Sequence, residues 1–179
     1  MRKIIAVSGR PGTGKTTLFR EFIKLNSWEK VEPAQLVSAM YCKDLDLYIL
    51  GKYDDGETFA GTDRLGMSCQ PNVTEWIRST NSNILFEGDR LTNGKFYNFL
   101  ISLPDVDVQF LILKVKEATL IQRYKDRDSN QSETFLKGRE TKIGNIQTNF
   151  EFMTYIQEFI NETIEDQTKI ITHIKNVYE

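Results

Sequence analysis

Five short apolar runs divide the chain, and longer polar segments separate them. The runs lie at residues 3–8, 45–50, 83–87, 108–115 and 168–174. After the first, third and fourth runs, apolar residues recur at helical spacing, in about residues 14–26, 93–103 and 117–128. Strands that alternate with helices are typical of a parallel sheet covered on both faces. The pattern therefore predicts an α/β fold in which ligands bind beyond the carboxyl ends of the strands.

A turn signal lies just ahead of the second run. Residues 36–42 and 45–50 are both mainly apolar, and the polar pair Lys43-Asp44 separates them. This arrangement favours a β-hairpin, with a short helix after Pro33 as the alternative.

The C-terminal part of the chain predicts one long helix followed by a strand. Apolar residues from Ile143 to Ile164 form a single stripe at helical spacing. The run at residues 168–174 would then close the sheet as its last strand. His173, the only histidine, falls in that run, and we interpret it as structural.

The turn after the first run carries a glycine-rich motif. Residues 9–16 match G-x-x-x-x-G-K-[ST] in full, with a strand pattern before them and a helix pattern after them. Backbone N–H groups of such a loop bind phosphate at the N-terminus of a helix. A glycine-rich turn without a ligand is the alternative. The residues expected to bind a nucleoside triphosphate are Gly9, Arg10, Pro11, Gly12, Thr13, Gly14, Lys15, Thr16 and Thr17.

This motif also assigns chemistry to two side chains. Lys15 is expected to reach the β- and γ-phosphates, and the Thr16 hydroxyl to bind Mg²⁺. The predicted cofactors are therefore ATP and Mg²⁺, although the sequence leaves a preference between ATP and GTP open.

Composition limits the range of functions. A chain of 179 residues suits one domain spanning residues 1–179, and its formal net charge of −2 argues against avid nonspecific binding of nucleic acid. Cys42 and Cys69 lack the spacing of a metal site or a redox motif. The first strand begins almost at Met1, and no apolar run is long enough for a membrane span. We therefore expect a cytoplasmic protein without a membrane partner, in the host cytoplasm if phage-encoded.

Residues after the later strands separate the classes of P-loop protein. No Asn/Thr-Lys-x-Asp stretch is available to read guanine, and the third run ends in Glu87-Gly88-Asp89-Arg90. This ending, the short chain and a late basic helical segment favour a kinase. The arrangement resembles the nucleotide-kinase group of P-loop phosphotransferases. That resemblance implies a P-loop NTPase fold with a five-stranded parallel sheet in the order 2-3-1-4-5, flanking helices and a helical lid, here with a β-hairpin insertion.

Candidate residues for phosphoryl transfer follow the third strand. Either Glu87 or Asp89 would hold the metal through water, because both supply a carboxylate near the phosphates. Arg90 would face the acceptor, as the Asp-Arg pair does in the thymidylate-kinase-like enzymes that this piece resembles. A capping carboxylate beside a surface arginine is the alternative.

The segment after the fourth strand carries the lid candidates. A guanidinium suits bidentate contacts with phosphate, so Arg127 and Arg139 are the first candidates and Arg123 is next. Lys137 and Lys142 could contact phosphate or be solvated.

A long polar loop at residues 51–66 is the predicted acceptor side. A hydroxyl acceptor needs a carboxylate as general base; Asp63 is the first candidate, with Asp44 and Asp54 behind it. A phosphate acceptor would instead need Arg64 and Arg90. Three aromatic residues are candidates to stack on a base: Tyr53, Phe59 and Trp76.

Two stretches extend the resemblance. Residues 51–65 and 132–142 resemble the phage-encoded 5-hydroxymethyluracil DNA kinases. That resemblance implies that ATP phosphorylates the 5-hydroxymethyl group of a base in DNA, as a step of DNA hypermodification. A nucleoside or nucleoside-monophosphate kinase and a nucleotide-binding regulatory protein are the alternatives, and the oligomeric state is open. The residues expected to form a basic rim for DNA are Lys43, Lys52, Arg64, Arg78, Arg90 and Lys95.

Overall fold

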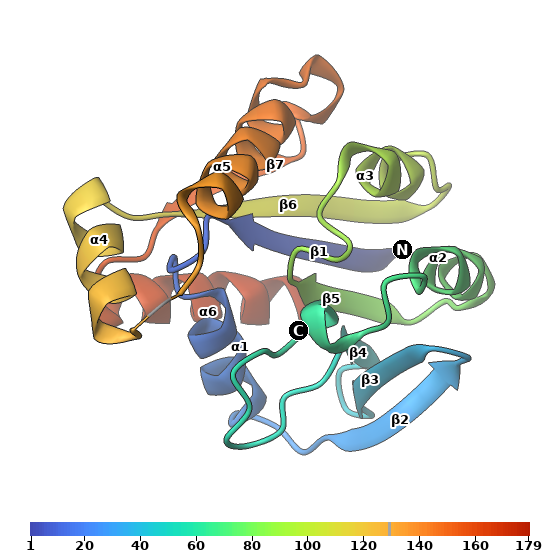
Figure 1. Ribbon diagram of the computed structural model, residues 1–179. Coiled ribbons are helices and arrows are strands. Elements are labelled where there is room, and N and C mark those ends of the chain that lie inside the picture. Colours follow the sequence, from blue (N-terminus) through green and yellow to red (C-terminus); the bar gives the residue numbers. More distant parts are fainter. Residues whose placement is uncertain (129) are drawn as a thin grey trace.

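The computed structural model describes residues 1–128 and 130–179, and it has three layers with a sheet between two layers of helices (Figure 1). The seven strands found among these described residues lie in the order β2-β3-β4-β5-β1-β6-β7. Their bounds are β1 (Arg2–Gly9), β2 (Glu29–Ala34), β3 (Val37–Cys42), β4 (Leu47–Leu50), β5 (Asn83–Glu87), β6 (Val106–Lys114) and β7 (Ile156–Ile160).

In the part of the chain that the structure describes, six α-helices and two short 3₁₀ helices connect and cover these strands. The α-helices are α1 (Lys15–Ile23), α2 (Gln70–Ser79), α3 (Gly94–Ile101), α4 (Glu117–Asp126), α5 (Glu133–Thr148) and α6 (Ile164–Tyr178). The 3₁₀ helices are η1 (Thr62–Arg64) and η2 (Phe150–Phe152).

The sheet is larger than expected and is mixed rather than all parallel. Its parallel part, β4-β5-β1-β6-β7, has the expected order 2-3-1-4-5. The predicted hairpin is confirmed, since β3 and β4 pair antiparallel. The sequence did not predict β2, which adds an antiparallel edge beside β3 and contains Pro33 next to a register shift. Proline donates no backbone hydrogen bond, so it fits only such an edge or a bulge.

The prediction of a strand at residues 168–174 was wrong. These residues lie inside α6, which begins at a capping box in which the Thr163 and Asp166 side chains bond each other's backbone N–H groups. Ile170, Ile174 and Tyr178 recur every four residues and are buried on one side of the helix. Tertiary packing of this face outweighs the strand preference of the β-branched residues.

The long helix predicted from Ile143 to Ile164 was also wrong in its extent. Helix α5 ends at Thr148, and Asn149 caps the short helix η2 with its side chain. β7 follows and pairs in parallel with β6, so the last strand of the sheet comes before α6 rather than after it. His173 therefore lies on a helix, where its Nε2 is 3.0 Å from Oε1 of Gln109.

Two separate cores fix the positions of the helices. On one face of the sheet, α2, α3 and α5 bury an aromatic cluster in which the rings of Tyr97 and Phe110 stack with their centroids 4.1 Å apart. On the other face, α1 and α6 bury the apolar residues of their inner sides. The loops that follow the parallel strands thus lie at one edge of a rigid sheet.

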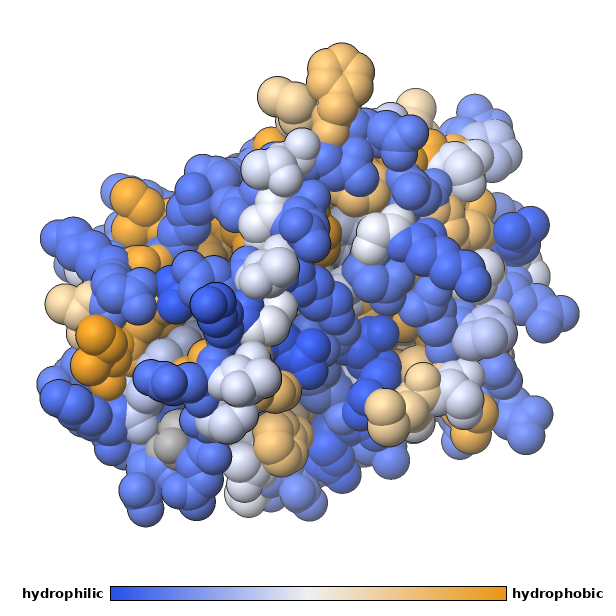
Figure 2. All heavy atoms as spheres, turned by 45° about the horizontal axis from the view of Figure 1, so that its top comes forward, coloured by the Kyte–Doolittle hydropathy of each residue, from blue (hydrophilic) through white to orange (hydrophobic). Residues whose placement is uncertain are grey.

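The surface near α5 is mainly hydrophilic (Figure 2). One apolar projection stands out where the chain turns after α5, and the exposed residues Phe150 and Met153 lie in that turn. Within residues 1–128 and 130–179, no helix combines the length and the apolar character needed to cross a membrane.

Candidate nucleotide-binding and phosphoryl-transfer site

The glycine-rich loop joins β1 to α1 and needs glycine for two reasons. Gly12 and Gly14 have φ angles of 85° and 89°, in the left-handed region that favours glycine. A Cβ atom on Gly12 would lie 2.9 Å from the ring of Tyr124, and one on Gly14 would lie 2.6 Å from Nδ2 of Asn161. The loop is therefore both strained for other residues and enclosed by its neighbours.

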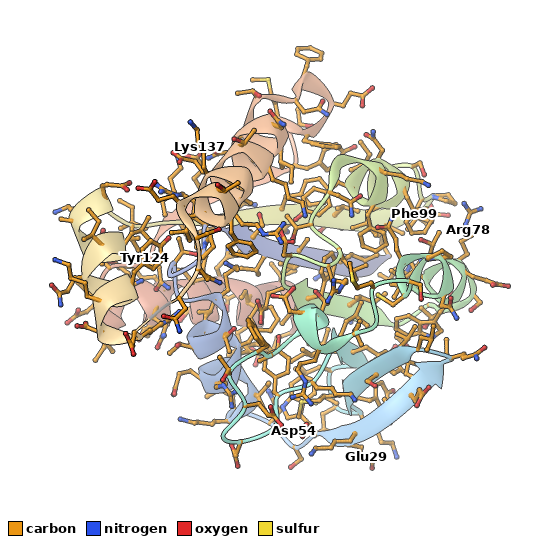
Figure 3. All side chains as sticks on the ribbon, viewed as in Figure 1. Glu29, Asp54, Arg78, Phe99, Tyr124 and Lys137 are labelled. Atoms are coloured by element: carbon orange, nitrogen blue, oxygen red, sulfur yellow. The ribbon has the colours of Figure 1, made fainter. Side chains whose placement is uncertain are left out.

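Helix α4 packs on this loop through two polar side chains. The Tyr124 hydroxyl donates to the carbonyl of Pro11 at 2.7 Å, and Figure 3 shows Tyr124 pointing inward from α4. Arg123 donates to the carbonyls of Gly12 at 2.7 Å and Asn161 at 3.0 Å. Arg123 thus joins the glycine loop to the segment after β7.

Lys15 lies inside the curve of the loop. Its Nζ donates to the carbonyls of Gly9 at 2.8 Å and Arg10 at 3.1 Å. Burial lowers the pKa of Lys15, whereas the nearby carboxylates of Glu87 and Asp63 act in the opposite direction. An anionic phosphate at this place would supply the charge that a buried ammonium group needs.

Glu87 ends β5 beneath the loop and is almost fully buried. Its Oε1 accepts hydrogen bonds from the Thr16 hydroxyl at 3.3 Å and the Tyr53 hydroxyl at 3.1 Å. Burial raises the pKa of Glu87 to about 7, although the positive charge of Lys15 partly opposes this. Glu87 is thus neutral for part of the time at physiological pH in the free protein.

Thr16 and Glu87 fit the expected Mg²⁺ by their chemistry. Both present oxygen atoms, the ligands that Mg²⁺ prefers, and they are within hydrogen-bond distance of each other. No group of three or more His, Cys, Asp or Glu able to hold a metal occurs among the described residues. Phosphate oxygens and water would therefore complete the coordination, which is usual for Mg²⁺ at nucleotide sites.

Replacing Glu87 by Gln should change how stability depends on pH. Because the pKa of Glu87 is higher in the folded protein than in the unfolded chain, its contribution to stability is complete below about pH 4.5 and is lost as the pH rises through about 7. The melting temperature of the Mg²⁺-free wild type should therefore fall by about 5 °C or more between pH 5 and pH 8. Glu87→Gln should remove most of this fall, as thermal melts in EDTA would measure; equal slopes for both proteins would contradict the assignment.

Asp63 connects the polar loop to the end of β5. Its Oδ1 accepts hydrogen bonds from the backbone N–H groups of Asp89 at 2.8 Å and Arg90 at 3.2 Å. Among residues 1–128 and 130–179, no group donates a hydrogen bond to its other oxygen, Oδ2. One oxygen of Asp63 is therefore structural, and the other is free to accept a proton.

Asp89 holds the lid helix α5 over the site. Arg139 lies 2.5 Å from Asp89 Oδ2, and Lys142 lies 2.9 Å from Oδ1. On the opposite side, Arg10 of the glycine loop pairs with Glu117 at 2.8 Å and with Glu140 of α5 at 3.7 Å. Ion pairs thus anchor α5 on both sides. Asp89 pairs with Arg139 and Lys142, which the sequence offered as contacts for phosphate.

These elements enclose a cavity of about 1020 Å³. The structure brings together much of the predicted machinery in its lining. The predicted site residues that line it are Gly9, Pro11, Gly12, Gly14, Lys15, Thr16, Phe59, Asp63, Glu87, Asp89, Arg90, Arg127 and Arg139. Phe59 is 60% exposed, so its ring is accessible to a ligand.

Five predicted acceptor residues lie outside this lining: Asp44, Tyr53, Asp54, Arg64 and Trp76. Trp76 instead packs its ring edge-on against Tyr48, with the centroids 5.0 Å apart. Tyr53 reaches the site only through its bond to Glu87, and its ring stacks on Phe19. Asp54 pairs with Lys30 at 2.7 Å and lies at the far end of the loop, away from α4 and α5 (Figure 3). The Arg64 guanidinium lies 3.8 Å from the Asp54 carboxylate, at the long end of the range for an ion pair.

The predicted basic rim does not assemble as a whole. Lys43 lies in the turn before β4, and Asp46 of that turn accepts a hydrogen bond from the first residue of β5. This turn is therefore at the edge of the sheet opposite the glycine loop. Arg78 lies in the last turn of α2, near the start of β1, and stacks on Phe99, also away from the cavity (Figure 3).

A second, smaller cavity of about 370 Å³ opens beside the glycine loop. Thr17, Arg123 and Arg127 line it together with the segment after β7. Asn161 of that segment donates to the carbonyl of Thr13 at 2.8 Å. Arg127 lines both cavities, so it lies between them.

The family model described as P-loop Nucleotide Kinase3 matches residues 1–177. The chain belongs to this family. Among solved structures, a gluconokinase from Sinorhizobium meliloti 1021 is similar with a TM-score of 0.53 and 12% identity, over 99% of this chain and 98% of the other. At that identity the likeness concerns the fold alone. No curated protein matches. The α/β kinase fold is thus confirmed for this member of the family.

Several side chains that shape the site were not predicted. Tyr124 and Asn161 contact the loop from α4 and from the end of β7. The sequence marks these two residues only by their position. Asn161 directly follows β7, and Tyr124 lies in α4, the helix that follows β6 on the ligand side of the sheet. Ser8 and Thr92 line the large cavity without belonging to any motif.

Proposed function

We propose that the protein is an ATP-dependent kinase that transfers the γ-phosphate to a hydroxyl group. The observation that carries this proposal is the meeting of Lys15, Asp63 and Glu87 in one cavity beside the glycine loop. A phosphate-binding ammonium group, a carboxylate with a free oxygen and a carboxylate beside Thr16 are the groups that such a transfer requires.

Asp63 supplies the general base in this proposal. The acceptor oxygen forms a bond to the γ-phosphorus, the bond from that phosphorus to the ADP oxygen breaks, and the hydroxyl proton passes to Asp63 Oδ2. Lys15 stabilises the charge that builds up on the phosphate oxygens. Mg²⁺, when bound at Thr16 and near Glu87, neutralises the phosphate charge further.

The smaller cavity is the proposed position of the nucleotide base. Two carbonyls hold the Arg123 guanidinium, and Arg123 lines this cavity. A planar guanidinium fixed in this way offers a face on which a base stacks. Arg127, between the two cavities, is placed for contact with phosphates.

Lid arginines complete the proposed donor side. Arg139 pairs with Asp89 in the free protein, and its Nε is buried without a hydrogen-bond partner in the described chain. A γ-phosphate in the cavity would compete with Asp89 for this guanidinium, since both are anions.

For the acceptor, we propose the 5-hydroxymethyl group of 5-hydroxymethyluracil in DNA. A carboxylate with a free oxygen suits an alcohol, and the exposed ring of Phe59 at the cavity suits a base taken out of the stack. The second candidate is a nucleoside or nucleoside-monophosphate kinase. It is favoured by membership of a nucleotide kinase family. It is also favoured by Arg90, because its Nε is buried without a hydrogen-bond partner in the described chain and would suit an acceptor phosphate.

A radiolabelled-ATP screen separates these functions. Labelled phosphate should appear on 5-hydroxymethyluracil DNA and should be absent from plain DNA and free mononucleotides. Transfer to free nucleosides or mononucleotides with the modified DNA inert would select the second candidate. ATP binding with no transfer to any acceptor would contradict a kinase function and select a regulatory nucleotide-binding protein.

A further inference from the structure

Tyr53 contacts the phosphoryl-transfer site through a single hydrogen bond to the carboxylate that ends β5. Its hydroxyl donates to Oε1 of Glu87 at 3.1 Å, and the Thr16 hydroxyl donates to the same oxygen at 3.3 Å. A carboxylate oxygen accepts about two hydrogen bonds, so these two donors use Oε1 fully. Glu87 lines the large cavity, and in the described part of the chain no donor bonds its other oxygen, Oε2. The carboxylate is therefore fixed at one oxygen and available at the other.

Packing against α1 holds the Tyr53 hydroxyl in this place. The Tyr53 ring stacks on Phe19, with the centroids 5.8 Å apart and the ring planes 11° from parallel. The polar loop that begins here passes beside α1, and Arg20 of that helix donates to the carbonyl of Asp54 at 3.4 Å (Figure 1). Because α1 also carries Thr16, one helix positions both donors to Glu87.

The polar loop closes at its base next to the same carboxylate. Lys52 and Gly61 exchange two backbone hydrogen bonds, of 3.2 and 2.8 Å. A Cβ atom on Gly61, whose φ is 67°, would lie 2.5 Å from Glu87 Oε1 and 3.0 Å from the Tyr53 hydroxyl. Thr62 then donates to the backbone carbonyl of Glu87 at 2.9 Å. Both ends of the predicted acceptor loop are therefore built against Glu87.

Hydrogen bonds of this kind have a large effect where a carboxylate serves a metal ion. The groups that bond such a carboxylate fix its orientation, and removing one lowers metal affinity by about 10- to 100-fold. Tyr53 is suited to this task because its hydroxyl is protonated at neutral pH and donates to the carboxylate. Oε2 is then the oxygen of Glu87 left for water bound to Mg²⁺.

We propose that Tyr53 is a positioning residue for Mg²⁺ binding: by holding Oε1 of Glu87, it leaves Oε2 for metal-bound water in the cavity. This role rests on the proposed function, in which Mg²⁺ accompanies ATP at Thr16 and Glu87. It replaces the base-stacking role that the sequence suggested for Tyr53, because the ring is occupied by Phe19 and lies outside the cavity lining.

The first test compares nucleotide binding with and without the metal. Calorimetry would titrate a non-hydrolysable ATP analogue into the protein in excess Mg²⁺ and again in EDTA. Tyr53→Phe should weaken binding about tenfold in Mg²⁺ and leave binding in EDTA unchanged, because the phenylalanine ring keeps the stacking on Phe19. Equal affinities of variant and wild type in Mg²⁺ would overturn the proposal, as would an equal loss in EDTA or a wild type whose binding ignores Mg²⁺.

The matched control is Tyr178→Phe, which removes another hydrogen-bonded tyrosine hydroxyl. Tyr178 donates to the carbonyl of Ile84 at 2.6 Å and lies outside the linings of both cavities. Its replacement should lower the melting temperature by about 2–4 °C and leave the ratio of the affinities in Mg²⁺ and EDTA as in the wild type. A tenfold change of this ratio in Tyr178→Phe would show a general effect of lost stability and would overturn the specific role of Tyr53.

A double-mutant cycle identifies the group through which Tyr53 acts. Glu87→Gln should itself weaken binding of the analogue in Mg²⁺, because an amide has no charge to attract metal-bound water. Adding Tyr53→Phe to Glu87→Gln should then cost less than about twofold further. The full tenfold loss in both backgrounds would mean that Tyr53 acts independently of Glu87, which would overturn the proposal.

These measurements remain separate from the test of the kinase itself, since none of them needs phosphoryl transfer. A protein that transfers phosphate to no acceptor would count against the proposed function, while the Mg²⁺-dependent loss in Tyr53→Phe would still support the positioning role. Active transfer together with an unchanged Mg²⁺ dependence in Tyr53→Phe would overturn the positioning role alone.

Discussion

Replacing Lys15 by Met should lower γ-phosphate transfer by about a thousandfold while leaving the fold intact. The Nζ group lies inside the glycine loop on the carbonyls of Gly9 and Arg10, where phosphate oxygens would meet it. Burial already lowers the pKa of Lys15, which means that the free protein bears a cost for this charge. An uncharged side chain of similar length should therefore not lower the melting temperature.

The matched control is Lys24→Met. Lys24 is just past the end of the same helix, α1, with its side chain 67% exposed beside Glu21. Its replacement should leave both transfer and melting temperature nearly unchanged. Transfer within a few-fold of wild type in Lys15→Met, measured with radiolabelled ATP on the acceptor found by the screen, would remove the phosphate-binding role.

The parts of the site that follow from sequence are those built by neighbouring residues. Gly12, Gly14, Lys15 and Thr16 form one continuous loop, so their spacing alone predicts their chemistry. Glu87 and Asp89 were predictable for a related reason, because the end of a parallel strand determines the edge of the sheet where they lie.

Contacts between distant parts of the chain were not predictable. Arg123 bonds Gly12 across 111 positions, and Tyr97 stacks on Phe110 only because α3 packs over β6. The pairing of Asp89 with Arg139 has the same origin, since α5 returns over the end of β5. Residue type and spacing do not show which helices pack together, so the pairing of Arg139 with the Asp89 carboxylate was not predicted.

The errors in the fold arise where two periodicities compete. Ile170 and Ile174 are β-branched, which favours a strand, yet their spacing of four equally fits a buried helical side. The capping box at Thr163 and Asp166 marks a helix start, and this local signal would have decided the case. β7 was absorbed into a helix because Ile156 and Ile160 are also four residues apart.

Replacing Asp63 by Asn should separate the structural role of this residue from its chemical one. The amide oxygen of Asn can accept the hydrogen bonds that Asp89 and Arg90 donate to Oδ1, so the loop should stay in place. The amide nitrogen cannot take a proton from the acceptor. The rate of transfer should therefore fall about a hundredfold, with little change in melting temperature.

Two comparisons make this prediction decisive. Asp55→Asn, in the same loop and fully exposed, should leave the rate unchanged. Asp63→Ala should lower the melting temperature as well as the rate, because it leaves the N–H groups of Asp89 and Arg90 without their acceptor. A loss of only a few-fold in Asp63→Asn would move the base to Asp89, since Asp54 pairs with Lys30 outside the cavity lining.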